Sequence, residues 1–156
     1  MKLLIGLGNP GEKYVNTRHN VGFFLCESLE KEKPNSSFVI QKSQSFMNDS
    51  GIFVTKMLQK YKIKLSDLYI VHDDLDLKLG EYKIQFDKGP KIHNGVNSVE
   101  EKLGSSAFWR IRIGVDNRDP ENRIIGHKYV LQNFEEKEKE ILVSVLDEIC
   151  KKLATF

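Results

Sequence analysis

Residues 2–20 read Lys-Leu-Leu-Ile-Gly-Leu-Gly-Asn-Pro-Gly-Glu-Lys-Tyr-Val-Asn-Thr-Arg-His-Asn, and this stretch decides the fold class. The apolar residues Leu3, Leu4 and Ile5 are typical of a buried strand, which ends in a glycine-rich polar loop. Open α/β sheets bind their ligands at the carboxyl ends of the strands, on loops of this kind. We therefore expect an α/β protein with functional side chains directly after its first strand.

Residues 6–11 also satisfy the G-x-G-x-x-G motif of dinucleotide-binding turns. In that motif a helix opens inside the glycine string, so that its N-terminal amides meet a pyrophosphate. Here Pro10 biases Asn9 away from helical dihedrals, and the helical pattern begins only at Val21. No second strand with a terminal acidic residue follows at the distance where a ribose would be held. The sequence instead indicates an amide, Asn9, and an imidazole, His19, on one loop.

The composition bounds the class of protein. A chain of 156 residues and 18.0 kDa predicts one domain over residues 1–156. Its 40% apolar and 29% charged residues are typical of a soluble globular protein. No apolar run approaches the length of a membrane span, and no signal-peptide pattern is present, so we expect a cytoplasmic protein without membrane contact. Cys26 and Cys150 lie in helical apolar patterns, which predicts buried thiols rather than a disulfide or a cysteine metal site.

Strand and helix patterns alternate along the chain. Strands are expected at 3–5, 38–40, 68–71, 81–86 and 109–115, and helices at 21–30, about 50–61, 95–103 and about 135–153, with a loop over 31–37. Asp49 or Ser50 is a candidate cap for the second helix, and Gly104 is the expected stop of the third. This alternation predicts a single three-layer α/β/α domain with a mixed, mainly parallel twisted sheet.

Short polar clusters lie just after a predicted strand or just before a predicted helix. The four clusters are Asn9 with Arg18-His19-Asn20, Phe46-Met47-Asn48, His72-Asp73-Asp74, and Ile92-His93-Asn94-Gly95. If the strands are parallel neighbours, these segments converge at one edge of the sheet.

The converging side chains suit hydrolysis of an ester by an activated water. A neutral His19 can take a proton from water near pH 7, and Asp73 can orient the ring and stabilise the imidazolium. The asparagine carboxamides offer donors to a developing oxyanion and acceptors to substrate amides. Because no G-x-S-x-G motif occurs, water is the expected nucleophile.

Structural interpretations stand beside this chemistry. Asn9 and Asn94 can stabilise a turn and cap a helix. The acidic residues within 73–76 can form a solvated turn or hold a hard cation, but no further carboxylate cluster accompanies them, so we expect no metal site. His72 is interpreted as structural, and His127 as a surface or helix-start residue.

Basic residues crowd the third quarter of the chain, although the net charge is only +2. They are Lys83, Lys88, Lys91, Arg110, Arg112, Arg118, Arg123 and Lys128. Such a local basic face can meet one phosphate strand, and a solvated mixture of charges is the alternative.

Several motifs, taken in order, resemble those of the bacterial-type peptidyl-tRNA hydrolases over nearly the whole chain. They are residues 6–11, Tyr14 with 17–20, 46–51, 72–77, 93–95 and 110–114. The resemblance implies an enzyme that cleaves the ester between a peptide and the 3′-terminal ribose of tRNA, without metal or other cofactor. It also implies peptidyl-tRNA as the partner, bound through its acceptor arm and 3′ end, and we expect a monomer.

The motifs carry the family's site onto this sequence. His19 would be the catalytic base and Asp73 its orienting carboxylate, with Asn9 beside them. The other implied substrate contacts are Asn48 and Asn94 with the peptide and ester, Tyr14 and Met47 in the peptide cleft, and His93, Arg110 and Arg112 toward the tRNA acceptor arm.

The chain departs from the family's pattern in three places. The segment 21–45 is short, which predicts a trimmed edge of the sheet. The loop 87–92, usually rich in glycine, contains Pro90 and Ile92 and is expected to be stiffer. Gln85 stands where the family often has a lysine, so phosphate recognition would fall to Lys83, Lys88 or Lys91. An RNA-binding protein without turnover on the same scaffold is the alternative function.

Overall fold

A five-stranded sheet forms the centre of the molecule, in the strand order β2-β1-β3-β5-β4. The computed structural model describes residues 1–32 and 37–156. The strands are β1 (Lys2–Gly6), β2 (Phe38–Lys42), β3 (Leu68–Lys78), β4 (Tyr82–Phe86) and β5 (Trp109–Asp116). Strands β2, β1, β3 and β5 run parallel, and β4 pairs with β5 in the antiparallel sense. The mixed, mainly parallel sheet predicted from the sequence is confirmed.

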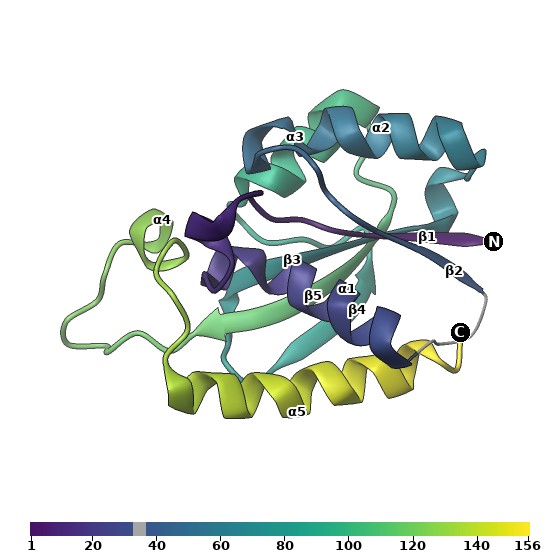
Figure 1. Ribbon diagram of the computed structural model, residues 1–156. Coiled ribbons are helices and arrows are strands. Elements are labelled where there is room, and N and C mark those ends of the chain that lie inside the picture. The colour runs from purple at the N-terminus through teal and green to yellow at the C-terminus, as the bar shows by residue number, and fades with distance from the viewer. Residues whose placement is uncertain (33–36) are drawn as a thin grey trace.

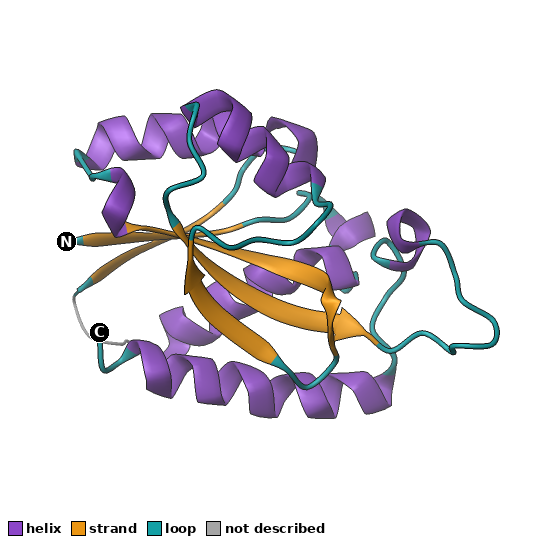
Figure 2. Cartoon of the chain, turned by 180° about the vertical axis from the view of Figure 1, so that it is seen from behind, coloured by secondary structure: helices purple, strands orange, loops and turns teal. Residues whose placement is uncertain are grey.

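Helices cover both faces of this sheet (Figures 1 and 2). On one face lie α1 (Val21–Glu32) and α5 (Glu136–Leu153), and on the other lie α2 (Ser50–Tyr61) and α3 (Asn94–Leu103). The short helix α4 (Gly126–Tyr129) lies apart from these layers, on the connection between β5 and α5. The three-layer architecture is therefore confirmed.

Each face of the sheet has its own apolar core, because successive side chains of a strand point to opposite faces. Leu4, Tyr69 and Ile111 pack under α1 and α5, whereas Leu3 and Ile70 pack under α2 and α3. The central strands β1 and β3 are buried on both sides, which is why they read as nearly continuous apolar runs in the sequence.

Helix α1 lies unusually close to β1 because both elements carry glycine at the contact. A Cβ atom on Gly6 would collide with the carbonyl oxygen of Gly22, and a Cβ atom on Gly22 would lie 2.7 Å from the carbonyl oxygen of Leu7. No helix opens within the glycine string, since α1 begins only at Val21. The argument against a dinucleotide-binding turn is thus confirmed by the backbone.

Several element boundaries differ from the sequence prediction. Strand β3 continues to Lys78 instead of ending at Val71, so Asp73 lies inside the sheet and pairs with Ile113 of β5. The cap of α3 is His93 and not Asn94, which is the first helical residue. Gly104 ends α3 with φ 65°, as expected. Of the predicted loop 31–37, α1 takes the first two residues, and residues 33–36 lie outside the described residues.

Candidate active site

The loop after β1 is closed on itself by a pair of hydrogen bonds. The backbone N–H of Asn9 donates to Asn20 Oδ1, and Asn20 Nδ2 donates to the Asn9 carbonyl, both at 2.9 Å. Asn9 Oδ1 accepts from the backbone N–H of Met47 at 2.8 Å, which ties this loop to the start of α2. The amide group of Asn9 is thereby oriented, with its Nδ2 as the remaining donor. Asn9 stabilises a turn, as expected, and also lines the cleft described below.

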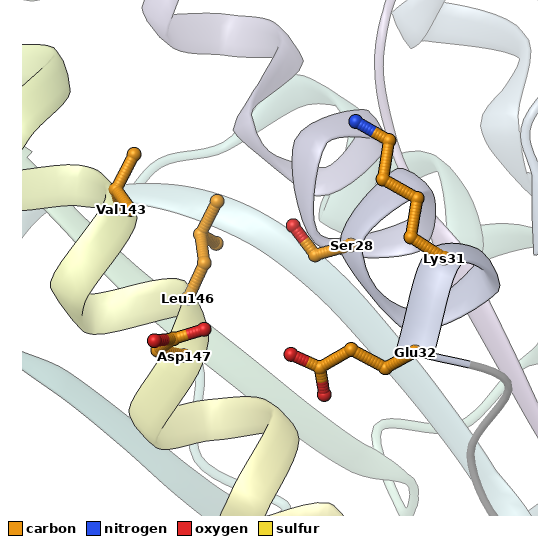
Figure 3. A pocket seen from close by; sticks show the side chains of 6 residues that line it. All are labelled: Ser28, Lys31, Glu32, Val143, Leu146 and Asp147. Atoms are coloured by element: carbon orange, nitrogen blue, oxygen red, sulfur yellow. The ribbon is translucent and has the colours of Figure 1, made fainter.

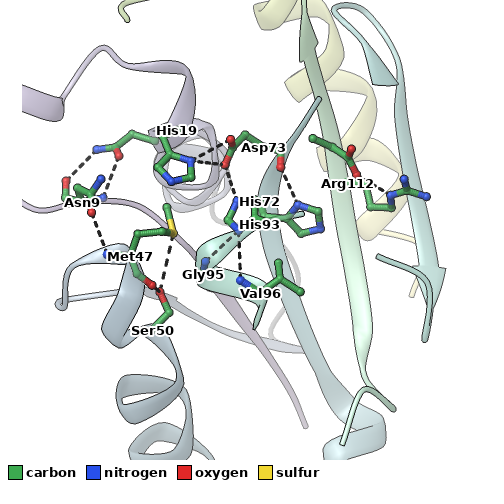
Figure 4. Close-up of polar contacts among 12 residues, drawn as sticks. Asn9, His19, Met47, Ser50, His72, Asp73, His93, Gly95, Val96 and Arg112 are labelled. Carbon is green, nitrogen blue, oxygen red and sulfur yellow. Dashed lines mark hydrogen bonds and ion pairs between the residues drawn. The ribbon is translucent and has the colours of Figure 1, made fainter. Parts of the chain in front are cut away.

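His19 and Asp73 form a buried pair between the loop after β1 and strand β3 (Figure 4). His19 Nδ1 lies 2.9 Å from both carboxylate oxygens of Asp73, and the His19 side chain is 11% exposed. Because an ionised carboxylate only accepts, Nδ1 carries the proton, and Nε2 is the nitrogen with a free lone pair. The pair predicted from the sequence is therefore brought together, with the second ring nitrogen available as a base.

A second imidazole donates to the same carboxylate. His93 Nε2 lies 2.8 Å from Asp73 Oδ1, and His93 Nδ1 accepts from the backbone N–H groups of Gly95 and Val96 at 3.1 and 3.2 Å. His93 is thus the N-cap of α3, and its capping bonds place the proton on Nε2. The resemblance implied a place for His93 toward the tRNA acceptor arm; in the structure its buried ring lies beside the His19–Asp73 pair and lines the cleft described below.

The electrostatics of the cluster favour an ionised Asp73 and a readily charged His19. Burial by itself raises the pKa of Asp73, but the charges and hydrogen bonds of His19 and His93 outweigh it and hold that pKa well below its usual range. Burial lowers the pKa of His19, and the attraction and hydrogen bond of Asp73 more than compensate, so that the pKa is raised above 6.5. In a catalytic triad, likewise, the orienting carboxylate stays ionised and stabilises the charged imidazolium.

His72 is a fully buried imidazole on the opposite face of β3. Its Nδ1 donates to the Asp73 carbonyl at 2.8 Å, and its ring meets that of His93 edge to face at 5.1 Å. Burial, followed by repulsion from His93, lowers the pKa of His72 to about 3. The ring is neutral at physiological pH and serves packing, so the structural interpretation made from the sequence agrees with its position.

A cleft of about 860 Å³ opens at His19. Its walls carry the expected Asn48 and Asn94, both exposed, together with the buried Met47. Tyr14 does not line the cleft and instead packs edge-on against Phe46, which does. Large exposed apolar side chains also face this space: Phe46, Ile92, Ile125 and Leu131. The cleft therefore combines a base, carboxamides and apolar walls.

Among the described residues, His19, Asp73 and His93 form the one group of side chains that could together ligate a metal ion. The candidate ligand atoms of His19, Asp73 and His93 lie within 4.8 Å of one another. To bind a cation, His93 would have to give up the Nε2 proton while its Nδ1 still accepts two backbone N–H bonds. An imidazole cannot do so without becoming an anion. The hydrogen bonding of His93 thus disfavours a metal at this position.

The basic side chains differ strongly in accessibility. Lys83, Lys88 and Lys91 are exposed, and Lys91 also lines the cleft. Arg112 is largely buried, with Nε on Asp74 at 2.7 Å and Nη1 on Gln85 at 2.8 Å.

The expectation that Arg110 faces a tRNA arm is contradicted by its position. This side chain is 1% exposed, its Nη2 is paired with Glu100 at 2.5 Å, and its Nη1 donates to the carbonyls of Ser106 and Phe108. A buried, ion-paired guanidinium does not present its charge to a phosphate.

A second, smaller cavity of about 220 Å³ lies between α1 and α5, away from the His19–Asp73–His93 cluster (Figure 3). It is lined by Ser28, Lys31, Glu32, Val143, Leu146 and Asp147. Its charged groups belong to exposed helix surfaces, and neither His19 nor Asp73 lines it.

Sequence reasoning missed two parts of the site. The wall formed by Ile125, Val130 and Leu131 belongs to the connection after β5, for which no element was predicted. The sequence contains apolar pairs there that follow no helical or strand period, Ile124-Ile125 and Val130-Leu131, and these pairs could have indicated an apolar wall. The sharing of Asp73 by His93 was also missed, since it depends on the packing of α3 against β3.

Together, fold and site define an α/β protein of the hydrolytic class, with an imidazole–carboxylate pair formed by the loop after β1 and the neighbouring parallel strand β3. The family model described as peptidyl-tRNA hydrolase matches residues 3–156. The peptidyl-tRNA hydrolase of Citrifermentans bemidjiense is 38% identical over 94% of this chain and 86% of its own length. That of Mycoplasmopsis pulmonis is 36% identical over 100% of this chain and 90% of its own length. This chain belongs to the peptidyl-tRNA hydrolase family.

Solved structures support the same assignment of the fold. The crystal structure of a peptidyl-tRNA hydrolase in complex with n-propanol superimposes with a TM-score of 0.82 at 25% identity, covering 99% of this chain and 87% of that one. The Acinetobacter baumannii peptidyl-tRNA hydrolase gives a TM-score of 0.81 at 24% identity, over 97% and 86% of the two chains.

Among the helices described in residues 1–32 and 37–156, none is long and apolar enough to cross a membrane.

Proposed function

We propose that this protein hydrolyses the ester bond between the peptide and the 3′-terminal ribose of peptidyl-tRNA and releases free tRNA and peptide. Membership of the family supports the reaction. The observation that carries the proposal is the buried His19–Asp73 pair, which leaves His19 Nε2 as a base at a cleft lined by carboxamides and apolar side chains.

His19 acts as the general base in the proposed mechanism. Nε2 removes a proton from water, and the resulting hydroxide attacks the ester carbonyl. Asp73, ionised and fixed in β3, stabilises the imidazolium that forms. The hydrogen bond from His93 to Oδ1 gives Asp73 a second donor, so the carboxylate keeps its orientation while the charge on His19 changes. When the tetrahedral intermediate collapses and its bond to the ribose breaks, the imidazolium protonates the leaving ribose oxygen.

The carboxamides position the substrate. Asn9 has Oδ1 committed to the Met47 amide, so Nδ2 is the donor for the ester carbonyl as it becomes an oxyanion. Asn48 and Asn94 are exposed on the cleft and hydrogen-bond peptide groups. The apolar side chains of Phe46, Ile92 and Leu131 receive the side chains of the peptide.

The tRNA acceptor arm meets the exposed lysines near the cleft in this proposal. Lys83, Lys88 and Lys91 supply phosphate contacts, with Arg112 behind them in an ion pair with Asp74. Arg110 is left out of this surface because it is buried and paired with Glu100.

The test is release of free tRNA from N-acetylaminoacyl-tRNA by the purified protein in the presence of EDTA. We expect turnover that EDTA does not reduce. The His19→Ala variant should lose roughly 10²–10⁴-fold in kcat, which is the usual contribution of a general base, and should still bind tRNA. Binding of RNA without turnover by the unaltered protein would favour the RNA-binding alternative instead.

A further inference from the structure

A buried ion pair lies directly behind the catalytic loop. Arg18, which precedes His19, is 3% exposed, and Glu138 of α5 is 1% exposed. Arg18 Nη2 donates to Glu138 Oε1 at 2.6 Å, Nη1 donates to the Tyr129 carbonyl at 3.2 Å, and the guanidinium lies 3.9 Å from the centre of the Tyr129 ring. This pair connects three segments that are far apart in the sequence.

The carboxylate of Glu138 accepts hydrogen bonds from several of these segments. Oε1 also accepts from the backbone N–H of Glu135 at 2.8 Å, which completes the capping box of α5. Oε2 accepts from Tyr129 Oη at 3.4 Å and from Asn117 Nδ2 at 3.3 Å. One side chain thus holds the start of α5, helix α4 and the end of β5 in one arrangement.

The backbone of the catalytic loop is attached to the same region. The N–H of His19 donates to the Val130 carbonyl at 2.8 Å, and the N–H of Arg18 donates to the Gln132 carbonyl at 3.1 Å. Val130 and Leu131 line the cleft. The position of His19 therefore depends on the segment 129–134, which Arg18 and Glu138 hold.

We propose that Arg18 and Glu138 are positioning residues for the hydrolytic reaction, which fix the base His19 and the cleft wall 129–134 relative to each other. The inference rests on the proposed function for its kinetic readout. A buried ion pair is seldom needed for stability, because apolar replacements of similar volume are often neutral or stabilising. The rate of the reaction, by contrast, depends on a fixed geometry, since a shift of the base by about 1 Å can lower the rate about 100-fold.

The decisive variant is the double replacement Arg18→Met with Glu138→Leu, which removes both charges and leaves none unpaired. Because the capping bond to Glu135 and the bonds from Tyr129 and Asn117 are lost as well, we expect a lower melting temperature, similar to that of a core truncation. Below that temperature, kcat should fall about 10–100-fold, and the KM for N-acetylaminoacyl-tRNA should change much less. The NMR signal of the His19 Nδ1 proton in its hydrogen bond to Asp73 should shift or broaden. Arg18→Lys, which keeps the charge but loses the planar fork, should give an intermediate rate.

Leu153→Ala is the matched control, because this buried residue of α5 lies at the far end of the helix and truncation destabilises without touching the ion pair. Its kcat and its His19 signal should stay unchanged below its melting temperature. A double variant with an unaltered kcat and His19 signal would overturn the proposal. If the unaltered protein shows no turnover at all, the proposed function fails, and the His19 signal alone decides the positioning role.

Discussion

At the scale of single residues, the two nitrogens of His19 have different tasks, and Asp73 assigns them. Because Asp73 raises the pKa of His19 above 6.5, the neutral base is present only above that raised value. The logarithm of kcat/KM should therefore climb with pH through the raised pKa and level off above it. Asp73→Asn removes the attracting charge, so the inflection should move to lower pH while the plateau falls roughly 10²–10⁴-fold.

Pre-steady-state or initial-rate profiles over a range of pH check this expectation. A control profile of Ser28→Ala, on the outer part of α1, should follow that of the unaltered protein. An inflection that stays in place in Asp73→Asn would mean that the carboxylate and His19 do not interact electrostatically.

His72 predicts how stability depends on pH. Its pKa is about 6.5 in the unfolded chain and about 3 in the folded protein, so the unfolded state binds more protons between these values. The stability that this neutral ring contributes is complete above pH 6.5 and is lost as the pH falls toward 3, by about 1.4 kcal/mol per pH unit.

Urea unfolding at a series of pH values measures this loss. His72→Phe removes the titrating group, and its free energy of unfolding should change less steeply with pH between 6 and about 4. If the free energy of unfolding fell equally steeply with decreasing pH in both proteins, a group other than His72 would be responsible for the loss of stability in acid.

At the scale of elements, the contact between β1 and α1 sets two opposing effects against each other at Gly22. Replacing a helical glycine by alanine favours the helix by about 1 kcal/mol. Here the new Cβ would lie 2.7–2.8 Å from backbone atoms of Leu7 and Val71, which cannot move aside as side chains do. We expect the collision to win, with a net destabilisation of about 1–3 kcal/mol.

Thermal or urea unfolding of Gly22→Ala gives the sign directly. Activity should fall as well, because a displaced α1 carries His19 with it. A stabilised Gly22→Ala protein would show that the sheet and the helix can separate without strain.

The elements also show what could be predicted from sequence. Apolar runs and helical periods located the strands and helices, and the clusters after β1 and in β3 identified His19 and Asp73 as partners. The end of β3 was missed because residues 72–78 are mostly polar, with only Leu75 and Leu77 apolar. The pairing with β5 that keeps them in the sheet is a long-range effect. Arg110 was misjudged for a related reason: alternation in β5 placed it on the less apolar face, whereas its burial depends on contacts with Glu100 of α3 and with Ser106 and Phe108.

At the scale of the whole molecule, the positions of the exposed lysines determine which part of the surface is proposed to contact tRNA. Lys83 lies on the edge strand β4, whose register places it opposite Arg112. Lys83→Ala should raise KM for full-length peptidyl-tRNA and reduce the slope of log binding constant against log salt by about 0.7–0.9. A minimal substrate, a peptide esterified to a short 3′-terminal oligonucleotide, should barely respond.

Lys151→Ala, an exposed lysine near the end of α5, provides the control and should leave both substrates unaffected. Lys83 is a cleaner probe than Arg112, because removing Arg112 would leave the buried Asp74 without its ion-pair partner. Equal losses on long and short substrates would remove Lys83 from the tRNA surface.

The cap of α3 has a consequence for heat tolerance. While the first turn of α3 is intact, the amides of Gly95 and Val96 keep the lone pair of His93 Nδ1 occupied and hold its proton toward Asp73. Local fraying of that single turn frees the ring to exchange tautomers, and the carboxylate then loses one of its two donors. Catalysis would thus decline with the opening of one helical turn, at temperatures where the rest of the chain is still folded. The upper working temperature of this enzyme would then be set by the local opening free energy at residues 93–96, and not by its global melting.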